Sequence, residues 1–96
     1  MGTITKKKMI YKIARSRGIH PNEVRVVVQS LLDGIKESLV NGDRCEFRNF
    51  GVFDIVIRKA KLGRNPKQAE IAIPIPEHKA VKFSPGKTLK TIVRKG

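Results

Sequence analysis

The sequence predicts an α+β fold in the order helix, helix, strand, strand, arm, strand, helix. Apolar residues recur at helical spacing through the first 40 residues. A central region from residue 44 to residue 83 is instead rich in β-branched residues and interrupted by Gly, Asn and Pro, which is typical of strands and hairpins. Ser84 and Pro85 then carry the pattern of a helix start. A chain of 96 residues forms one domain (1–96) with a modest core.

The first two predicted helices have clear local boundaries. Thr5 can cap the first helix and Gly18 ends it, while Pro21 suits the first position of the second, which closes at Asn41 and Gly42. The second helix has a wide apolar stripe: Val24, Val27, Val28, Leu31, Leu32, Ile35 and Leu39. A DNA-reading helix-turn-helix is therefore disfavoured, because a helix this apolar belongs in a core.

The central region predicts a long β-hairpin with strands over 52–58 and 70–76 and its tip at Gly63–Pro66. A shorter strand precedes it at 44–47, and the chain returns as a strand at 79–83. Pro74 and Pro76 have no amide hydrogen, so this strand should keep an unpaired edge. We expect a two-stranded arm over about 58–76 that leaves a body formed by 1–57 and 77–96. It should be mobile until something anionic orders it.

Positive charge is abundant and segregated. The net charge is +13, and residues 1–21 and 78–96 contain no acid. The arm is also basic over 58–67, through Arg58, Lys59, Lys61, Arg64 and Lys67. Such segregation favours one basic face and a polyanionic partner. Within this arm, Pro66 is a rigid apolar wedge of the kind that enters the minor groove of DNA.

Several classes of protein are disfavoured by what the sequence lacks. Cys45 is the single cysteine, and His20 and His78 have no partner at metal-ligand spacing. We find no catalytic constellation, phosphate loop, dinucleotide fingerprint or membrane-spanning run. We therefore expect no enzyme activity, metal, cofactor, small-molecule substrate or membrane association, and a cytoplasmic location.

Apolar surface exceeds what one small subunit can cover. Four phenylalanines fall on the predicted sheet, and the stripe of the second helix adds to them. Part of this surface should face a second copy of the chain. The predicted core and dimer contacts are Phe47, Phe50, Phe53, Phe83, Leu31 and Ile35.

Three segments together carry a family resemblance: Phe50–Phe53, Gly63–Pro66 and Lys82–Lys90. In order and spacing they resemble the bacterial HU and integration host factor family of histone-like DNA-bending proteins, over about Thr5 to Val93. The resemblance implies an intertwined homodimer with a helical body, a three-stranded antiparallel sheet forming a saddle, and two arms that follow the minor groove. Nucleoid association follows from the same likeness.

The resemblance also assigns roles to residues. Pro66 becomes the intercalating residue, and the other DNA-binding positions lie on the arm, the saddle and the last helix. With the neighbouring arm lysine and one lysine of the first helical turn, the predicted DNA-binding set is Arg58, Lys61, Arg64, Asn65, Pro66, Lys67, Lys82, Lys87, Lys90 and Lys6. The chain departs from the family pattern at Val56, where a basic residue is frequent, and at 67–70, which lack the usual glycine.

The leading hypothesis is thus a non-catalytic architectural protein that binds and bends duplex DNA with little sequence preference, for compaction and stabilisation. Two alternatives stay open. One is an RNA-binding or ribosome-associated basic protein, although the wide, shallow minor groove of A-form RNA suits two arms poorly. The other is a site-specific bending cofactor for recombination or replication, which differs only in selectivity.

Overall fold

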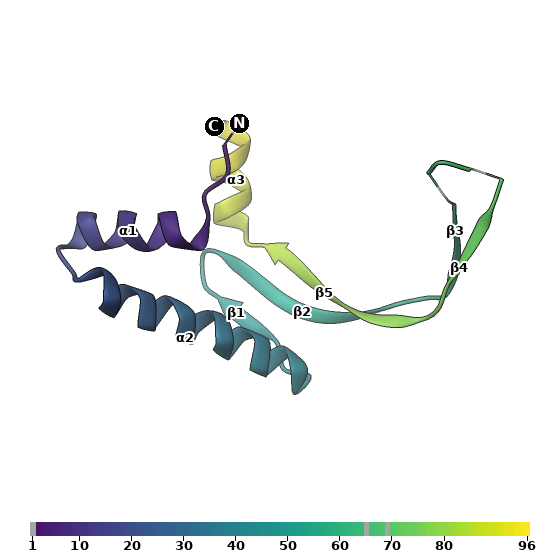
Figure 1. The fold of residues 1–96 in the computed structure, drawn as a ribbon, viewed down its shortest axis with the longest axis horizontal. Coiled ribbons are helices and arrows are strands. Elements are labelled where there is room, and N and C mark those ends of the chain that lie inside the picture. Colours follow the sequence, from purple (N-terminus) through teal and green to yellow (C-terminus); the bar gives the residue numbers. More distant parts are fainter. Residues whose placement is uncertain (1, 65, 69) are drawn as a thin grey trace. The chain divides into compact units, whose positions relative to one another are not determined.

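The computed structural model describes residues 2–64, 66–68 and 70–96 and confirms an α+β fold. Its elements are α1 (Lys6–Arg17), α2 (Pro21–Val40), β1 (Cys45–Phe47), β2 (Gly51–Arg58), β3 (Lys61–Arg64), β4 (Ala72–Ile75), β5 (His78–Pro85) and α3 (Lys87–Lys95) (Figure 1). The chain divides into two compact units, one up to Glu37 and one from Ser38 onward.

The first unit is a helical hairpin with a very small core. The Thr5 hydroxyl accepts a hydrogen bond from the Lys8 amide at 3.2 Å, and Gly18 ends α1 in the left-handed conformation with φ of 65°. Ile10 is only 1% exposed and packs with Ala14 and Val24. The half-buried Ile13 and Val28 extend this cluster. Both predicted boundaries of α1 are confirmed.

The start of α2 depends on His20. Its ring Nδ1 accepts a hydrogen bond from the Asn22 amide at 3.1 Å, so the imidazole acts as the N-terminal cap of this helix. On the exposed side of α2, Asp33 accepts a hydrogen bond from Gln29 at 2.8 Å and pairs with Lys36. Both interactions stabilise the charged carboxylate and hold the pKa of Asp33 below its usual range.

The second unit contains a three-stranded antiparallel sheet in the order β1-β2-β5. Phe53 stands opposite both Cys45 of β1 and Phe83 of β5. Asn49 adopts a positive φ of 68° in the turn between β1 and β2, a conformation that asparagine tolerates. This turn lets the chain reverse between a three-residue strand and an eight-residue one.

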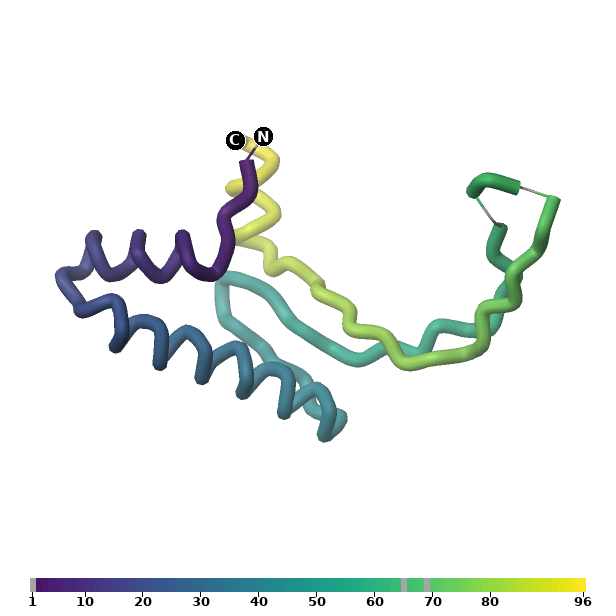
Figure 2. The backbone as a smooth tube through the Cα atoms, viewed as in Figure 1, coloured from purple at the N-terminus to yellow at the C-terminus, as the bar shows by residue number. Residues whose placement is uncertain are grey.

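Beyond this sheet the chain continues as a two-stranded ribbon, which the tube in Figure 2 follows to the tip and back. β3 and β4 form a separate sheet in which Lys61 stands opposite Ile75. Arg58 opposite His78 is the last pair of the preceding ladder, so both ladders keep one register. By that register Pro76 falls opposite Ala60, at the point where pairing stops. A proline cannot donate a ladder hydrogen bond, which accounts for the interruption.

Four details of the sequence prediction were wrong. Strand 52–58 pairs with β5 rather than with 70–76, and Glu70 and Ile71 precede β4. Helix α3 begins at Lys87 with Gly86 as its cap, so Ser84 and Pro85 start no helix. They extend β5 instead, because Pro85 pairs with Gly51 and the next amide, of Gly86, donates to the Phe50 carbonyl at 2.9 Å. Phe50 itself lies in the turn before β2.

Candidate nucleic-acid interface

One face of the three-stranded sheet is polar and carries part of the predicted site. Lys82 stands directly opposite Asp54, and Arg58 stands opposite His78 four pairs further along the ladder. Alternation along the strands puts these four side chains on the same face. Val56 and Ala80 form a pair on the same face between them, so this face has an apolar gap between the two polar pairs.

Asp54 is the acidic group of this face. Its Oδ2 lies 3.8 Å from Arg44 Nε, and its Oδ1 accepts a hydrogen bond from the Ile55 amide at 2.8 Å. Arg44, Asp54 and Lys82 therefore form a row of alternating charge across the sheet. Arg44 was not among the predicted DNA-binding residues, although extending the alternation of the first strand back by one residue indicates it.

The opposite face of the sheet is aromatic. The rings of Phe47 and Phe53 meet edge to face at 6.2 Å between centroids, and Phe53 lies 4.8 Å from Phe83. Phe50 reaches the same cluster from its turn, 5.4 Å from Phe83. Despite these contacts Phe50 remains 48% exposed and Phe83 38% exposed. The surface is thus an apolar patch, and the sheet separates it from the charged side.

The ribbon presents cations on both of its faces. Lys61 and Arg64 lie in β3 at positions of opposite parity, so their side chains project from opposite sides. Pro66 and Lys67 follow in the turn and are exposed. The predicted contact Asn65 lies outside the described residues. The ribbon therefore combines charge along its length with an apolar ring near its end.

The remaining predicted residues lie elsewhere. Lys87 and Lys90 are both exposed in the first turn of α3. Lys6 belongs to the first unit, where its ammonium donates to Gln29. Leu31 is 52% exposed and Ile35 half-buried on α2. The second unit thus brings together the saddle and arm residues, while Lys6, Leu31 and Ile35 belong to the other unit.

Across residues 2–64, 66–68 and 70–96, no three histidine, cysteine or acidic side chains come together in a way that could hold a metal ion. In the same part of the chain, every helix is too short or too polar to cross a bilayer.

A small α+β chain with a charged sheet face and a cationic two-stranded ribbon belongs to the class of basic, ribbon-armed proteins. Comparison with known proteins identifies the family. The family model described as "Bacterial DNA-binding protein" matches residues 4–94. A probable DNA-binding protein HU of Chlamydia trachomatis is 54% identical over 93 residues, covering 97% of this chain and 93% of its own length. The integration host factor subunit alpha of Hahella chejuensis is 33% identical over 93 residues, covering 97% of this chain and 92% of its own length.

A solved structure agrees with these relatives. The HU protein in a structure titled "Anabaena HU-DNA cocrystal structure" superimposes with a TM-score of 0.83 at 29% identity, covering 96% of this chain and 99% of that one. The chain belongs to the HU and integration host factor family of bacterial DNA-binding proteins.

Proposed function

We propose that this protein is a non-catalytic architectural protein that binds duplex DNA through the minor groove and bends it, largely without sequence preference. The observation that carries the proposal is the ribbon, with Lys61 and Arg64 on opposite faces and Pro66 exposed near its end. Cations on both faces suit a strand pair lying inside a groove between two phosphate backbones. A wedge at the end suits unstacking of a base step, which kinks the duplex.

The sheet supports a second set of contacts. Lys82 and Arg58 share one face, so phosphates passing over this face could bind both cations. Lys87, Lys90 and Lys6 are proposed as phosphate contacts at the flanks. Contacts to phosphate orient the protein but carry no direct sequence information, so selectivity would come from how easily a given sequence bends.

The active form is proposed to be a homodimer whose two copies share the apolar surface. Phe50, Phe83 and Leu31 are each more than a third exposed, and burying large apolar side chains is the main gain of association. Two copies would supply two arms, one for each side of a bent duplex. The domain is taken as 1–96 with a DNA-binding arm at 58–76, and the protein is proposed to associate with the nucleoid.

One binding experiment tests the function. Intact, nicked and pre-bent DNA duplexes are titrated at two salt concentrations, with duplex RNA as competitor. About 6–10 phosphate contacts per dimer predict a slope of log K against log salt of roughly −5 to −9. We expect nicked and pre-bent DNA to bind more tightly, because less stacking remains to be broken. A slope shallower than about −2, or equal competition by duplex RNA, would argue against minor-groove wrapping.

A further inference from the structure

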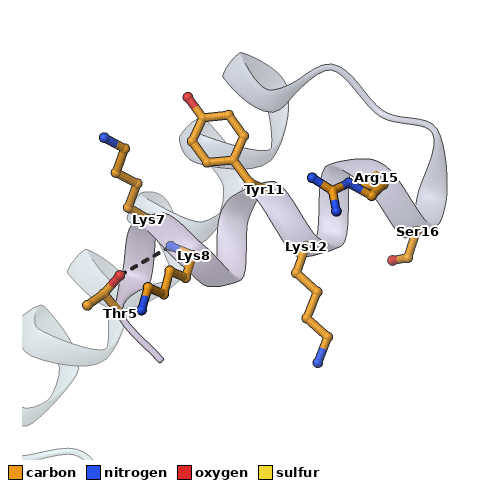
Figure 3. Close-up of a pocket in the computed structure, with 7 residues that line it drawn as sticks. All are labelled: Thr5, Lys7, Lys8, Tyr11, Lys12, Arg15 and Ser16. Atoms are coloured by element: carbon orange, nitrogen blue, oxygen red, sulfur yellow. Dashed lines mark hydrogen bonds between the residues drawn. The ribbon is translucent and has the colours of Figure 1, made fainter. Parts of the chain in front are cut away.

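The exposed side of α1 forms a basic face that the proposed function does not use. Seven residues line a shallow depression there: Thr5, Lys7, Lys8, Tyr11, Lys12, Arg15 and Ser16. Figure 3 shows their side chains spread along the helix, with the hydroxyl of Thr5 bonded to the Lys8 amide. Two rows at helical spacing make up the face, Lys7-Tyr11-Arg15 and Lys8-Lys12-Ser16. Each row is about 12 Å long.

This face is directed away from the core of its own unit. Ile10 and Ala14, which are buried, mark the side of α1 that packs against α2. Tyr11 lies between Lys7 and Arg15 in the first row and is 43% exposed. Its phenol can donate to a phosphate oxygen, and so can the neighbouring ammonium and guanidinium groups.

In the part of the chain that the structure describes, no acidic side chain pairs with the charges of this face. Helix α1 has no acidic residue. Among the described residues, the side chains of Lys7, Lys12 and Arg15 have no hydrogen-bond or ion-pair partner. Lys6 differs, since it donates to Gln29 and lies outside the depression. The lysines of the first turn also oppose the helix macrodipole, a disadvantage that an anionic ligand would remove.

We propose that the face formed by Lys7, Lys8, Tyr11, Lys12 and Arg15 is a second binding site for the phosphate backbone of duplex DNA, independent of the arm. A row about 12 Å long matches about two to three phosphates along one strand of the duplex. The face takes either the flank of the duplex that the arms hold or a second duplex, and in the latter case the protein bridges DNA. This inference rests on the proposed function.

The test compares two triple variants of the full-length chain. Lys7→Gln, Lys12→Gln and Arg15→Gln together remove the unpartnered charges while keeping residues of good helix propensity. Arg17→Gln, Arg25→Gln and Lys36→Gln together remove the same charge from helix positions outside the depression. Circular dichroism confirms that both variants fold. Each is then measured by titration with one labelled duplex over a salt series, and by capture of a labelled duplex on an immobilised one.

Either of two results supports the proposal. If the face holds the flank of the same duplex, the face variant loses about two to three units of salt slope for each face engaged, relative to the control variant. If it holds a second duplex, capture falls several-fold while the single-duplex slope matches the control. Equal behaviour of the two variants in both measurements would overturn the proposal.

A third variant distinguishes a failure of this proposal from a failure of the proposed function on which it rests. Arg58→Gln, Lys61→Gln and Arg64→Gln together remove arm charge and leave α1 intact. Weakened binding by this variant, with no effect of the α1 substitutions, would refute the α1 site while the arm-based function stands. Binding that neither set changes would instead refute the proposed function itself.

Discussion

At the scale of single residues, Gly51 shows how closely the sheet is packed. A Cβ atom added there would lie 2.6 Å from the ring of Phe83 and 2.7 Å from the backbone oxygen of Ser84. Gly63 in the ribbon differs, because an added Cβ would lie 2.9 Å from Ile75 Cδ1, the far end of a flexible side chain. The aromatic patch therefore tolerates no extra atom at Gly51, whereas the ribbon can adjust at Gly63.

We accordingly expect Gly51→Ala to lower the free energy of unfolding by about 1–3 kcal/mol, as overpacking usually does. Gly63→Ala should change it by less than about 1 kcal/mol, because the Ile75 side chain can rotate away. Denaturant unfolding of the two variants under identical conditions measures the difference. Equal destabilisation would show that the contact with the Ser84 backbone does not limit the sheet.

Substitutions at Pro66 and Arg64 should affect DNA bending and DNA affinity separately. Pro66→Ala keeps every arm charge but removes the apolar ring, so binding to linear DNA should stay within about tenfold while bending falls sharply. Arg64→Ala should do the reverse, lowering affinity and reducing the salt slope by roughly one unit. A fluorescence-transfer bend assay beside a titration on the same duplex measures both. If Pro66→Ala bends DNA like the parent, the tip is only a turn.

Val56 offers a gain-of-contact test on the polar face of the sheet. It is half-buried opposite Ala80, between the Asp54–Lys82 and Arg58–His78 pairs. Val56→Arg should place a cation in this gap and make the salt slope more negative by about one unit per protomer. Val40→Arg adds the same charge at an exposed position at the end of α2 and serves as the control. The same slope for both variants would mean that the gap does not meet phosphate.

At the scale of elements, the ribbon is the part of the fold with little packing to stabilise it. β3 and β4 pair only with each other, so each keeps an open edge. Leu62 is 68% exposed and Ile73 44% exposed, so the ribbon buries little apolar surface. The ladder is also interrupted opposite Pro76. Two-stranded ribbons without a buried face are marginally stable in water.

Amide exchange should therefore be fast in β3 and β4 of the free protein and much slower in β2 and in the helices. Adding duplex DNA should slow exchange in the ribbon, because contacts to both backbones order it. Hydrogen-exchange mass spectrometry without and with DNA measures this. Protection in the free ribbon equal to that of α2 would contradict the expectation.

At the scale of the whole molecule, the exposed apolar surface favours association with a second copy of the chain. In the part of the chain that the structure describes, the buried apolar residues are Ile10, Ala14 and Val24. Many larger apolar side chains remain exposed, including Val27 at 68% and Leu31 at 52%. A core this small cannot offset the conformational entropy lost when about 96 residues fold. A second copy covering this surface would supply the missing burial.

We therefore expect unfolding to be coupled to dissociation. The thermal midpoint should rise as protein concentration is raised, since association stabilises only the folded state. Calorimetry over a hundredfold concentration range measures the midpoint, and sedimentation at the same concentrations measures the mass. A constant midpoint together with a monomer mass would contradict the dimer.

The sequence by itself determined the features that depend on near neighbours. Thr5 and Gly18 act within a few residues, through hydrogen bonds at the helix ends, and their roles in the structure are the predicted ones. The basic arm and its proline were also predictable, because charge and the missing amide hydrogen are properties of the residues themselves.

Only the tertiary structure decided which strands pair and which side chains lie on the same face of the sheet. Ser84 and Pro85 have the local pattern of a helix start, yet pairing with β2 keeps them extended. The row of Arg44, Asp54 and Lys82 likewise joins residues far apart in the chain. Strand register depends on partners distant in sequence, and a shift of one residue moves every side chain to the other face. Local patterns hold no information about that choice, so the charged face of the sheet emerges only when the strands are paired.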